Sequence, residues 1–182
     1  MPYYTGIGSR STPPGVQASM TELAALLRGR GWRLRSGAAE GADQAFGRGA
    51  GAMADIYVPW RGFGYAERGA RVVALDPNYL LDDDHMRCLR LGCPHVARLS
   101  QGAHKLHARN CYQVLGDSLS DPSEFVVCWT PGGQVQGGTA TAIRLARAAQ
   151  VPVFNLGDPK GRPALLAWLA GWQDALRRHV AR

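Results

Sequence analysis

Short apolar segments alternate with segments of helical periodicity along most of the chain, and this alternation constrains the fold more than any other feature. Parallel strands need a long crossover between them, and that crossover is usually a helix. Strands that alternate with helices are therefore typical of a parallel sheet covered on both faces. We predict an α/β fold, a Rossmann-like three-layer sandwich with a mostly parallel sheet and helices on both faces.

The expected elements follow from hydrophobic periodicity and from breaks rich in glycine and proline. We predict strands over residues 3–7, 32–36, 54–58, 71–75, 125–129 and 151–156. We predict helices over residues 16–30, 42–50, 80–91, 105–115, 139–150 and 163–179. The chain has 182 residues and no visible repeat or linker, so we expect one domain over residues 1–182.

Composition excludes several classes of protein. Apolar residues make up 46% of the chain, which is enough to bury a core without disulfides or a structural metal. No run approaches the roughly 20 apolar residues of a membrane helix, and the N-terminus lacks the pattern of a secretory signal. The cysteines form no C-x-x-C pair and match no standard zinc spacing. We expect a cytoplasmic protein with reduced thiols, no membrane partner, no metal and no cofactor.

Three polar, glycine-bearing loops follow predicted strands, at the carboxyl ends where open α/β sheets bind their ligands. They span residues 6–12, 36–43 and 130–139, and the last one opens a predicted helix. Glycines let backbone N–H groups approach an anion, and a helix N-terminus attracts one. The G-x-G-x-x-G and P-loop spacings are absent, which disfavours nicotinamide and ATPase functions. The candidate phosphate-binding residues of these loops are Gly8, Ser9, Arg10, Ser36, Gly37, Gly41, Gly137, Gly138 and Thr139.

Most of these residues also have a purely structural interpretation. Arg10 could clamp a phosphate or lie in solvent on a turn. Ser36 could bind ligand or cap the next turn, and Thr139 at a helix start could be a cap, a ligand group or both. We favour the phosphate interpretation because three such loops stand at strand ends together.

Glu40 and Asp43 are the candidate catalytic residues. They are three positions apart and could face one site, where a carboxylate would hold ribose hydroxyls or act as general acid or base on an N-glycosidic bond. Alternatively, Asp43 caps the helix at 42–50 and Glu40 lies in solvent. Arg109 and Asn110 follow a basic run and could close over a base or phosphate, or form a solvated helix face.

Two further features leave the choice of partner open. The net charge is +7, from 21 lysines and arginines against 14 acidic residues, and it favours nucleotides or nucleic acid. An arginine-rich composition would also follow from a GC-rich genome. Trp60, Phe63 and Tyr65 lie in a glycine-rich segment, where they could stack on a base or anchor a long loop.

The loops resemble those of the DNA-processing protein A (Smf) family. Residues 6–10 are similar to its G-S-R turn, residues 36–45 to its S-G-x-A-x-G-I-D-x-x-A segment, and residues 137–153 to its S-G-T…A…V segment. That family belongs to the SLOG superfamily of Rossmann-like nucleotide-binding folds, with the Lonely Guy phosphoribohydrolases. Residues 107–116 and 128–130 resemble stand-alone phage or prophage members. Where the phosphoribohydrolases carry a catalytic Glu, three positions after the threonine, this chain has Ala142.

The resemblance implies three functions, in the cytoplasm of a bacterial host. The first is binding of a nucleotide or nucleotide-derived small molecule, with hydrolysis of an N-glycosidic bond if the protein is an enzyme. The second is non-catalytic binding of single-stranded DNA, and the third is sequestration of a nucleotide signal. A homodimer is expected by analogy with related proteins.

Overall fold

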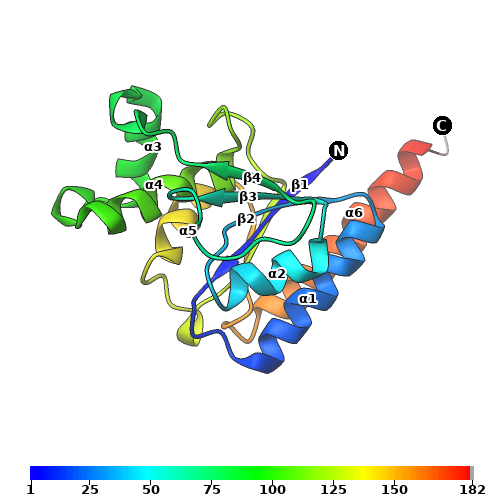
Figure 1. Cartoon of the computed structure of the whole chain (residues 1–182). Coiled ribbons are helices and arrows are strands. Elements are labelled where there is room, and N and C mark those ends of the chain that lie inside the picture. Colours follow the sequence, from blue (N-terminus) through cyan, green and yellow to red (C-terminus); the bar gives the residue numbers. More distant parts are fainter. Residues whose placement is uncertain (181–182) are drawn as a thin grey trace.

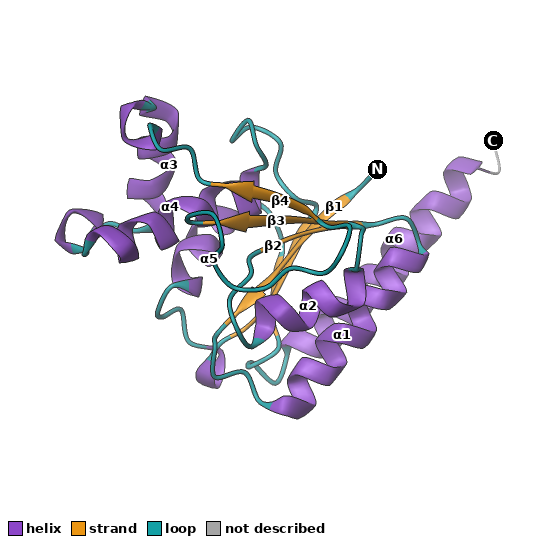
Figure 2. Ribbon diagram, in the orientation of Figure 1, coloured by secondary structure: helices purple, strands orange, loops and turns teal. Residues whose placement is uncertain are grey.

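The computed structural model describes residues 1–180 of the chain, with side chains through residue 172. Its centre is a six-stranded sheet in the order β4-β3-β2-β1-β5-β6, and every neighbouring pair is parallel. Figure 2 shows these strands lying between two groups of helices. The strands are β1 (Tyr3–Gly8), β2 (Arg33–Ser36), β3 (Ala54–Val58), β4 (Arg71–Ala74), β5 (Phe125–Trp129) and β6 (Val153–Asn155).

Helices cover both faces of this sheet, as Figure 1 shows. One face carries α1 (Pro14–Gly29), α2 (Ala42–Ala50) and α6 (Gly161–Val180). The other face carries α3 (Asp83–Gly92), α4 (Gln101–Leu115) and α5 (Thr139–Ala148). Short 3-10 turns lie at Tyr79–Leu81, Val96–Arg98 and Pro131–Gly133. The predicted α/β sandwich is therefore confirmed.

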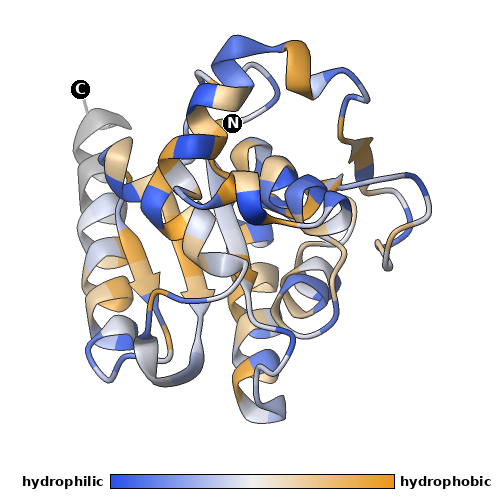
Figure 3. Cartoon of the chain, turned by 90° about the vertical axis from the view of Figure 1, so that its left-hand side faces the viewer, coloured by the Kyte–Doolittle hydropathy of each residue, from blue (hydrophilic) through white to orange (hydrophobic). Residues whose placement is uncertain are grey.

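Side chains of β5 alternate between two apolar cores, because successive residues of a strand point to opposite faces of the sheet. In β5, Phe125 and Val127 enter the core beneath α1, α2 and α6, and Val126 and Cys128 enter the core beneath the other three helices. All four are fully buried. In Figure 3 some of the strand arrows are coloured as hydrophobic. Burial of one such aliphatic or aromatic side chain stabilises the fold by about 1.5–3 kcal/mol.

Helix ends differ from the predictions where local capping outweighs periodicity. Helix α1 begins at Pro14, two residues before the predicted start, because proline is well suited to the first position of a helix. Helix α4 begins at Gln101, four residues early, with the hydroxyl of Ser100 accepting a hydrogen bond from the N–H of Ala103. Helix α3 begins at Asp83, three residues later than predicted, because Asp82 is its N-cap. The Asp82 carboxylate accepts a hydrogen bond from the N–H of His85.

The strand order places a topological switch point beside β1. The chain runs outward from β1 through β2 and β3 to β4, and then crosses back to β5 on the other side of β1. The connections that leave β1 and β5 therefore diverge to opposite faces and open a crevice at their carboxyl ends. Within residues 1–180, no helix combines the length and the apolar character needed to cross a membrane.

Candidate functional site

A cavity of about 660 Å³ lies at this switch point. Its walls are the turn that follows β1, the start of α2, one face of α4, and the loop from β5 to α5. The structure brings together at this cavity the predicted residues Gly8, Ser9, Arg10, Asp43, Arg109, Asn110, Gly137, Gly138 and Thr139.

Glycines shape the turn that follows β1. A Cβ atom on Gly8 would lie 2.7 Å from the Cβ of Ala42 and 2.8 Å from the carbonyl oxygen of Trp129. Gly41 has a φ of +82°, and a Cβ there would lie 2.6 Å from the carbonyl oxygen of Ser9. These positions accept only glycine without displacement of the backbone. They bring the turn close to α2 and leave the side chain of Arg10 exposed at the mouth of the cavity.

Arg109 and Asp43 form a buried ion pair at the floor of the cavity, with 3.3 Å between Nη2 and Oδ2. Burial raises the pKa of the Asp43 carboxyl, and the nearby Arg109 guanidinium opposes that shift. Burial likewise lowers the pKa of Arg109, and the Asp43 charge opposes that shift. Gly37 makes room for the pair, because a Cβ there would lie 2.1 Å from Nη1 of Arg109.

Two residues that line the cavity carry hydrogen-bond donors with no acceptor among the described residues. These donors are Nε and Nη1 of Arg109 and Nε2 of Gln113, and all three atoms are buried. Arg109 is 6% exposed and Gln113 is 1% exposed, and both residues line the cavity. A buried donor without an acceptor costs about 1–3 kcal/mol, and more when it is charged. The cavity is therefore suited to a ligand rich in hydrogen-bond acceptors.

Two side chains of α4 fasten the loop between β5 and α5. The Nδ2 group of Asn110 donates to the carbonyl oxygen of Gly138 at 2.9 Å. The Nδ1 atom of His107 lies 2.6 Å from the hydroxyl oxygen of Thr141 in the first turn of α5. Burial and neighbouring positive groups lower the pKa of His107. Thr139 is the first residue of α5, and the N-cap position is Gly138.

Four predicted residues, Ser36, Gly37, Glu40 and Gly41, do not line the cavity. The Ser36 hydroxyl donates to the carbonyl oxygen of Gly6 at 2.5 Å, so it joins β2 to β1. Gly37 and Gly41 accommodate neighbouring groups, as described above. Glu40 is exposed, and the structure does not bring it together with Asp43 at one cavity.

Some lining residues were not predicted as ligand groups, notably His107, Gln113, Thr130 and Gln136. His107 and Gln113 lie on the same face of α4 as Ala103, Leu106 and Asn110, at spacings of three and four residues. This helical spacing is the signal that would have identified them. Within the described part of the chain, no group of three or more His, Cys, Asp or Glu side chains could hold a metal ion.

Comparison with known proteins places the fold. No family model matches the chain, and neither does any curated protein. DNA processing protein A from Helicobacter pylori, described for its single-stranded DNA binding mode, aligns with a TM-score of 0.51 and 18% identity over 91% of this chain and 72% of that chain. The Moco carrier protein of Chlamydomonas rheinhardtii aligns with a TM-score of 0.53 and 16% identity over 100% of this chain and 99% of that chain. These likenesses confirm a Rossmann-like fold similar to that of DNA processing protein A.

Proposed function

We propose that this protein binds a nucleotide or nucleotide-derived ligand in the cavity at the switch point, with the phosphate near Arg10 and Arg109. The observation that carries the proposal is the group of buried donors on Arg109 and Gln113 that lack acceptors within the described residues. Phosphate oxygens are strong acceptors, and a guanidinium group can bind two of them at once. The volume of about 660 Å³ also lies within the range of small-molecule sites.

The charges around the cavity support an anionic ligand. Asp43 is the only carboxylate among the described lining residues, and its charge is directed at Arg109. The guanidinium of Arg10 makes no ion pair within the part of the chain that the structure describes. The N-terminus of α5 lies at the same cavity, where the positive end of the helix dipole favours negative charge.

Titration calorimetry with nucleoside 5′-monophosphates, dinucleotides and inorganic phosphate tests this function. We expect Arg10→Ala to weaken nucleotide binding roughly 10- to 100-fold, the effect of losing a charge-assisted hydrogen bond. Gln113→Leu should weaken it less, because a neutral donor is lost. Arg68→Ala, which removes an exposed arginine outside the cavity, should leave the affinity unchanged. Failure of every nucleotide to bind, or equal affinity of all three variants, would contradict the proposal.

Hydrolysis of an N-glycosidic bond is the reaction that we assign to this site if it is catalytic. Asp43 is then the candidate acid or base, because it lines the cavity and Glu40 does not. Position 142 carries a buried alanine within α5, so it supplies no carboxylate. Chromatography measures the release of free base from nucleoside monophosphates. This release should be lost in Asp43→Asn and retained in Glu40→Gln. Recovery of intact nucleotides would leave binding, or sequestration of a nucleotide signal, as the function.

Single-stranded DNA binding is the second candidate. The net charge of +7 favours it, and the structurally similar DNA processing protein A from Helicobacter pylori is described as binding single-stranded DNA. Contacts with phosphates release counterions, so the logarithm of the affinity should fall linearly with the logarithm of salt concentration. Fluorescence titration of a labelled oligonucleotide over a range of salt concentrations measures that slope. A flat dependence would exclude a phosphate-backbone interface.

A further inference from the structure

A second cavity, of about 620 Å³, lies at the carboxyl ends of β3 and β4. It shares no lining residue with the cavity at the switch point. Helix α4 separates the two, since His107 and Asn110 face the first cavity and Lys105 and Tyr112 face the second. The second cavity is therefore independent of the function proposed above.

Trp60 gives this cavity an exposed aromatic wall. Its side chain is 42% exposed although tryptophan is usually well buried. The ring is held edge-to-face by Phe63, with 5.2 Å between ring centroids, and Phe63 packs against the core. The same loop is fastened at Gly64, where a Cβ would lie 1.9 Å from the carbonyl oxygen of Ala38. The indole ring is thus partly exposed and held in place, as a stacking surface requires.

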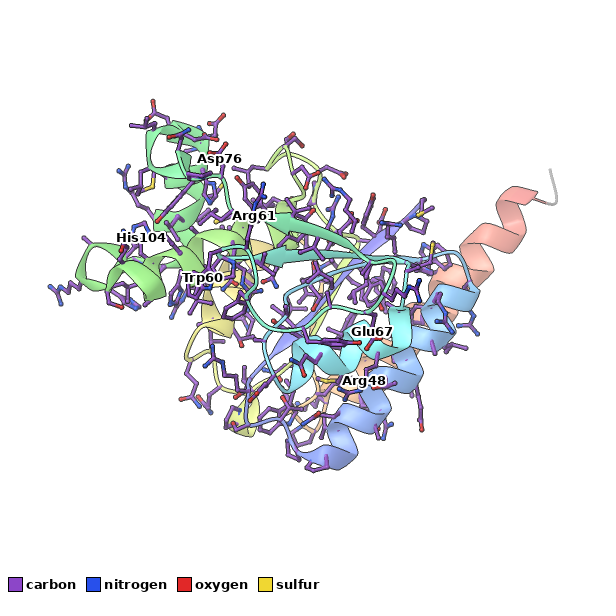
Figure 4. The ribbon with its side chains drawn as sticks, viewed as in Figure 1. Arg48, Trp60, Arg61, Glu67, Asp76 and His104 are labelled. Carbon is purple, nitrogen blue, oxygen red and sulfur yellow. The ribbon has the colours of Figure 1, made fainter. Side chains whose placement is uncertain are left out.

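Two cations at this cavity lack partners. Arg61 and Lys105 form no hydrogen bond or ion pair with any residue that the structure describes. The third cation, Arg71, is already paired with Asp55 and Asp117. Figure 4 shows Trp60 and Arg61 on the side of the molecule toward which β3 and β4 point, well apart from Arg48.

The two acidic groups of this cavity differ, because only Asp117 forms an ion pair with a described residue. Asp117 is bound by Arg71 and also accepts a hydrogen bond from the hydroxyl of Tyr57 at 2.8 Å. Asp76 accepts a hydrogen bond from the N–H of Asn78 through Oδ1, which leaves its other oxygen free to accept from a hydroxyl or amino group. The free cations and the indole face together suit a planar ring that bears a phosphate.

From this arrangement we infer that the cavity is a second binding site, which takes one nucleotide unit with its base against Trp60 and its phosphate between Arg61 and Lys105. Aromatic rings stack on any nucleobase, and both cations donate strong hydrogen bonds to phosphate oxygens. A free nucleotide and one unit of a single-stranded polynucleotide share this chemistry.

Nuclear magnetic resonance distinguishes this site from the first, because Trp60 is the only tryptophan that lines either cavity among the described residues. The Trp60 indole N–H signal is assigned by its loss in Trp60→Phe. We expect saturable movement of that signal on addition of adenosine 5′-monophosphate, a short oligothymidylate, or both. Movement with the monophosphate identifies a free nucleotide as the ligand, and movement with the oligothymidylate alone identifies a polynucleotide.

Variants test the cations. Arg61→Gln and Lys105→Gln should each weaken the Trp60 response about tenfold or more, which corresponds to one lost charge-assisted contact. Arg48→Gln removes an exposed arginine from α2, outside the cavity, and should leave the response unchanged. A Trp60 signal that neither probe moves would overturn the inference, even where amide signals of Gly8 and Gly138 shift. Shifts of the Trp60 signal with no shift at those amides would instead contradict the function proposed for the switch-point cavity and support binding at the second cavity.

Discussion

Arg109 has two roles that depend on one another. Its Nη2 group is paired with Asp43, and its Nε and Nη1 groups have no acceptor within the described structure. A buried guanidinium without a counter-ion is costly, so Asp43 allows Arg109 to stay charged inside the protein. Only Nη2 of the guanidinium is paired, and under the proposed function the remaining N–H groups bind the ligand. In that case the pair keeps the binding group charged and in place before the ligand arrives.

Removal of Asp43 should be strongly destabilising. We expect Asp43→Ala to lower the free energy of unfolding by about 3–5 kcal/mol, because it leaves Arg109 buried without its partner. The matched control is Asp84→Ala, which breaks the exposed pair between Asp84 and Arg87. Exposed pairs contribute at most about 1 kcal/mol. Urea denaturation measures both changes, and equal losses in the two variants would show that the buried pair has no special role.

At the scale of elements, α1 and α2 pack unusually closely. A Cβ atom on Gly49 of α2 would lie 2.1 Å from the carbonyl oxygen of Thr21 and 2.7 Å from the Cβ of Ala24, both in α1. Gly47, in the same helix, has nothing within 4 Å of its Cβ position. Gly49 thus serves helix-to-helix contact, and Phe46 of the same helix packs edge-to-face against Tyr4 of the sheet.

This pair of glycines gives a matched test. Gly49→Ala should destabilise the protein by about 1–3 kcal/mol, because the added methyl forces backbone atoms apart. Gly47→Ala should be neutral or stabilise it by up to about 1 kcal/mol, since alanine favours the helix. Thermal unfolding followed by circular dichroism compares the two. A loss of stability in Gly47→Ala that matches the loss in Gly49→Ala would refute close packing as the cause.

The buried strands and the compact helix α2 were predictable, whereas helix starts and side-chain directions were not. The bounds of α2, β3 and β5 match the predictions because a glycine or a proline follows within two residues of the end of each element. The start of α4 was missed because residues 101–104 contain a glycine and no large apolar residue, so they show no apolar stripe. The loops at the cavity were predictable from strand ends. The separation of Glu40 from Asp43 was not, because it depends on how the turn at Gly41 directs each side chain.

At the scale of the whole molecule, both cavities lie along the carboxyl edge of one sheet. Every strand is parallel, so all six carboxyl ends and their loops meet at this edge. The switch point opens one cavity between β1 and β5, and the exposed end of the sheet at β4 opens the other. Helix α4 forms a wall of each. A change in the stability or position of α4 would therefore affect both cavities. The histidines in and around this helix make its stability depend on pH, which can be measured.

Stability should fall as the pH drops from about 7 to about 5. Burial lowers the pKa of His85, His104 and His107, so below the unfolded value of about 6.5 the unfolded chain binds more protons than the folded one. The stabilisation is thus present above that value and lost as the pH falls toward the folded pKa values. The raised pKa of Asp43 has the opposite effect on stability, but this effect is the same in the wild-type protein and in a His107 variant, because both keep Asp43.

His107→Gln should therefore lose less free energy of unfolding between the two pH values than the wild-type protein does. Urea denaturation at both pH values measures this difference, and an identical loss in both proteins would exclude His107 as a contributor.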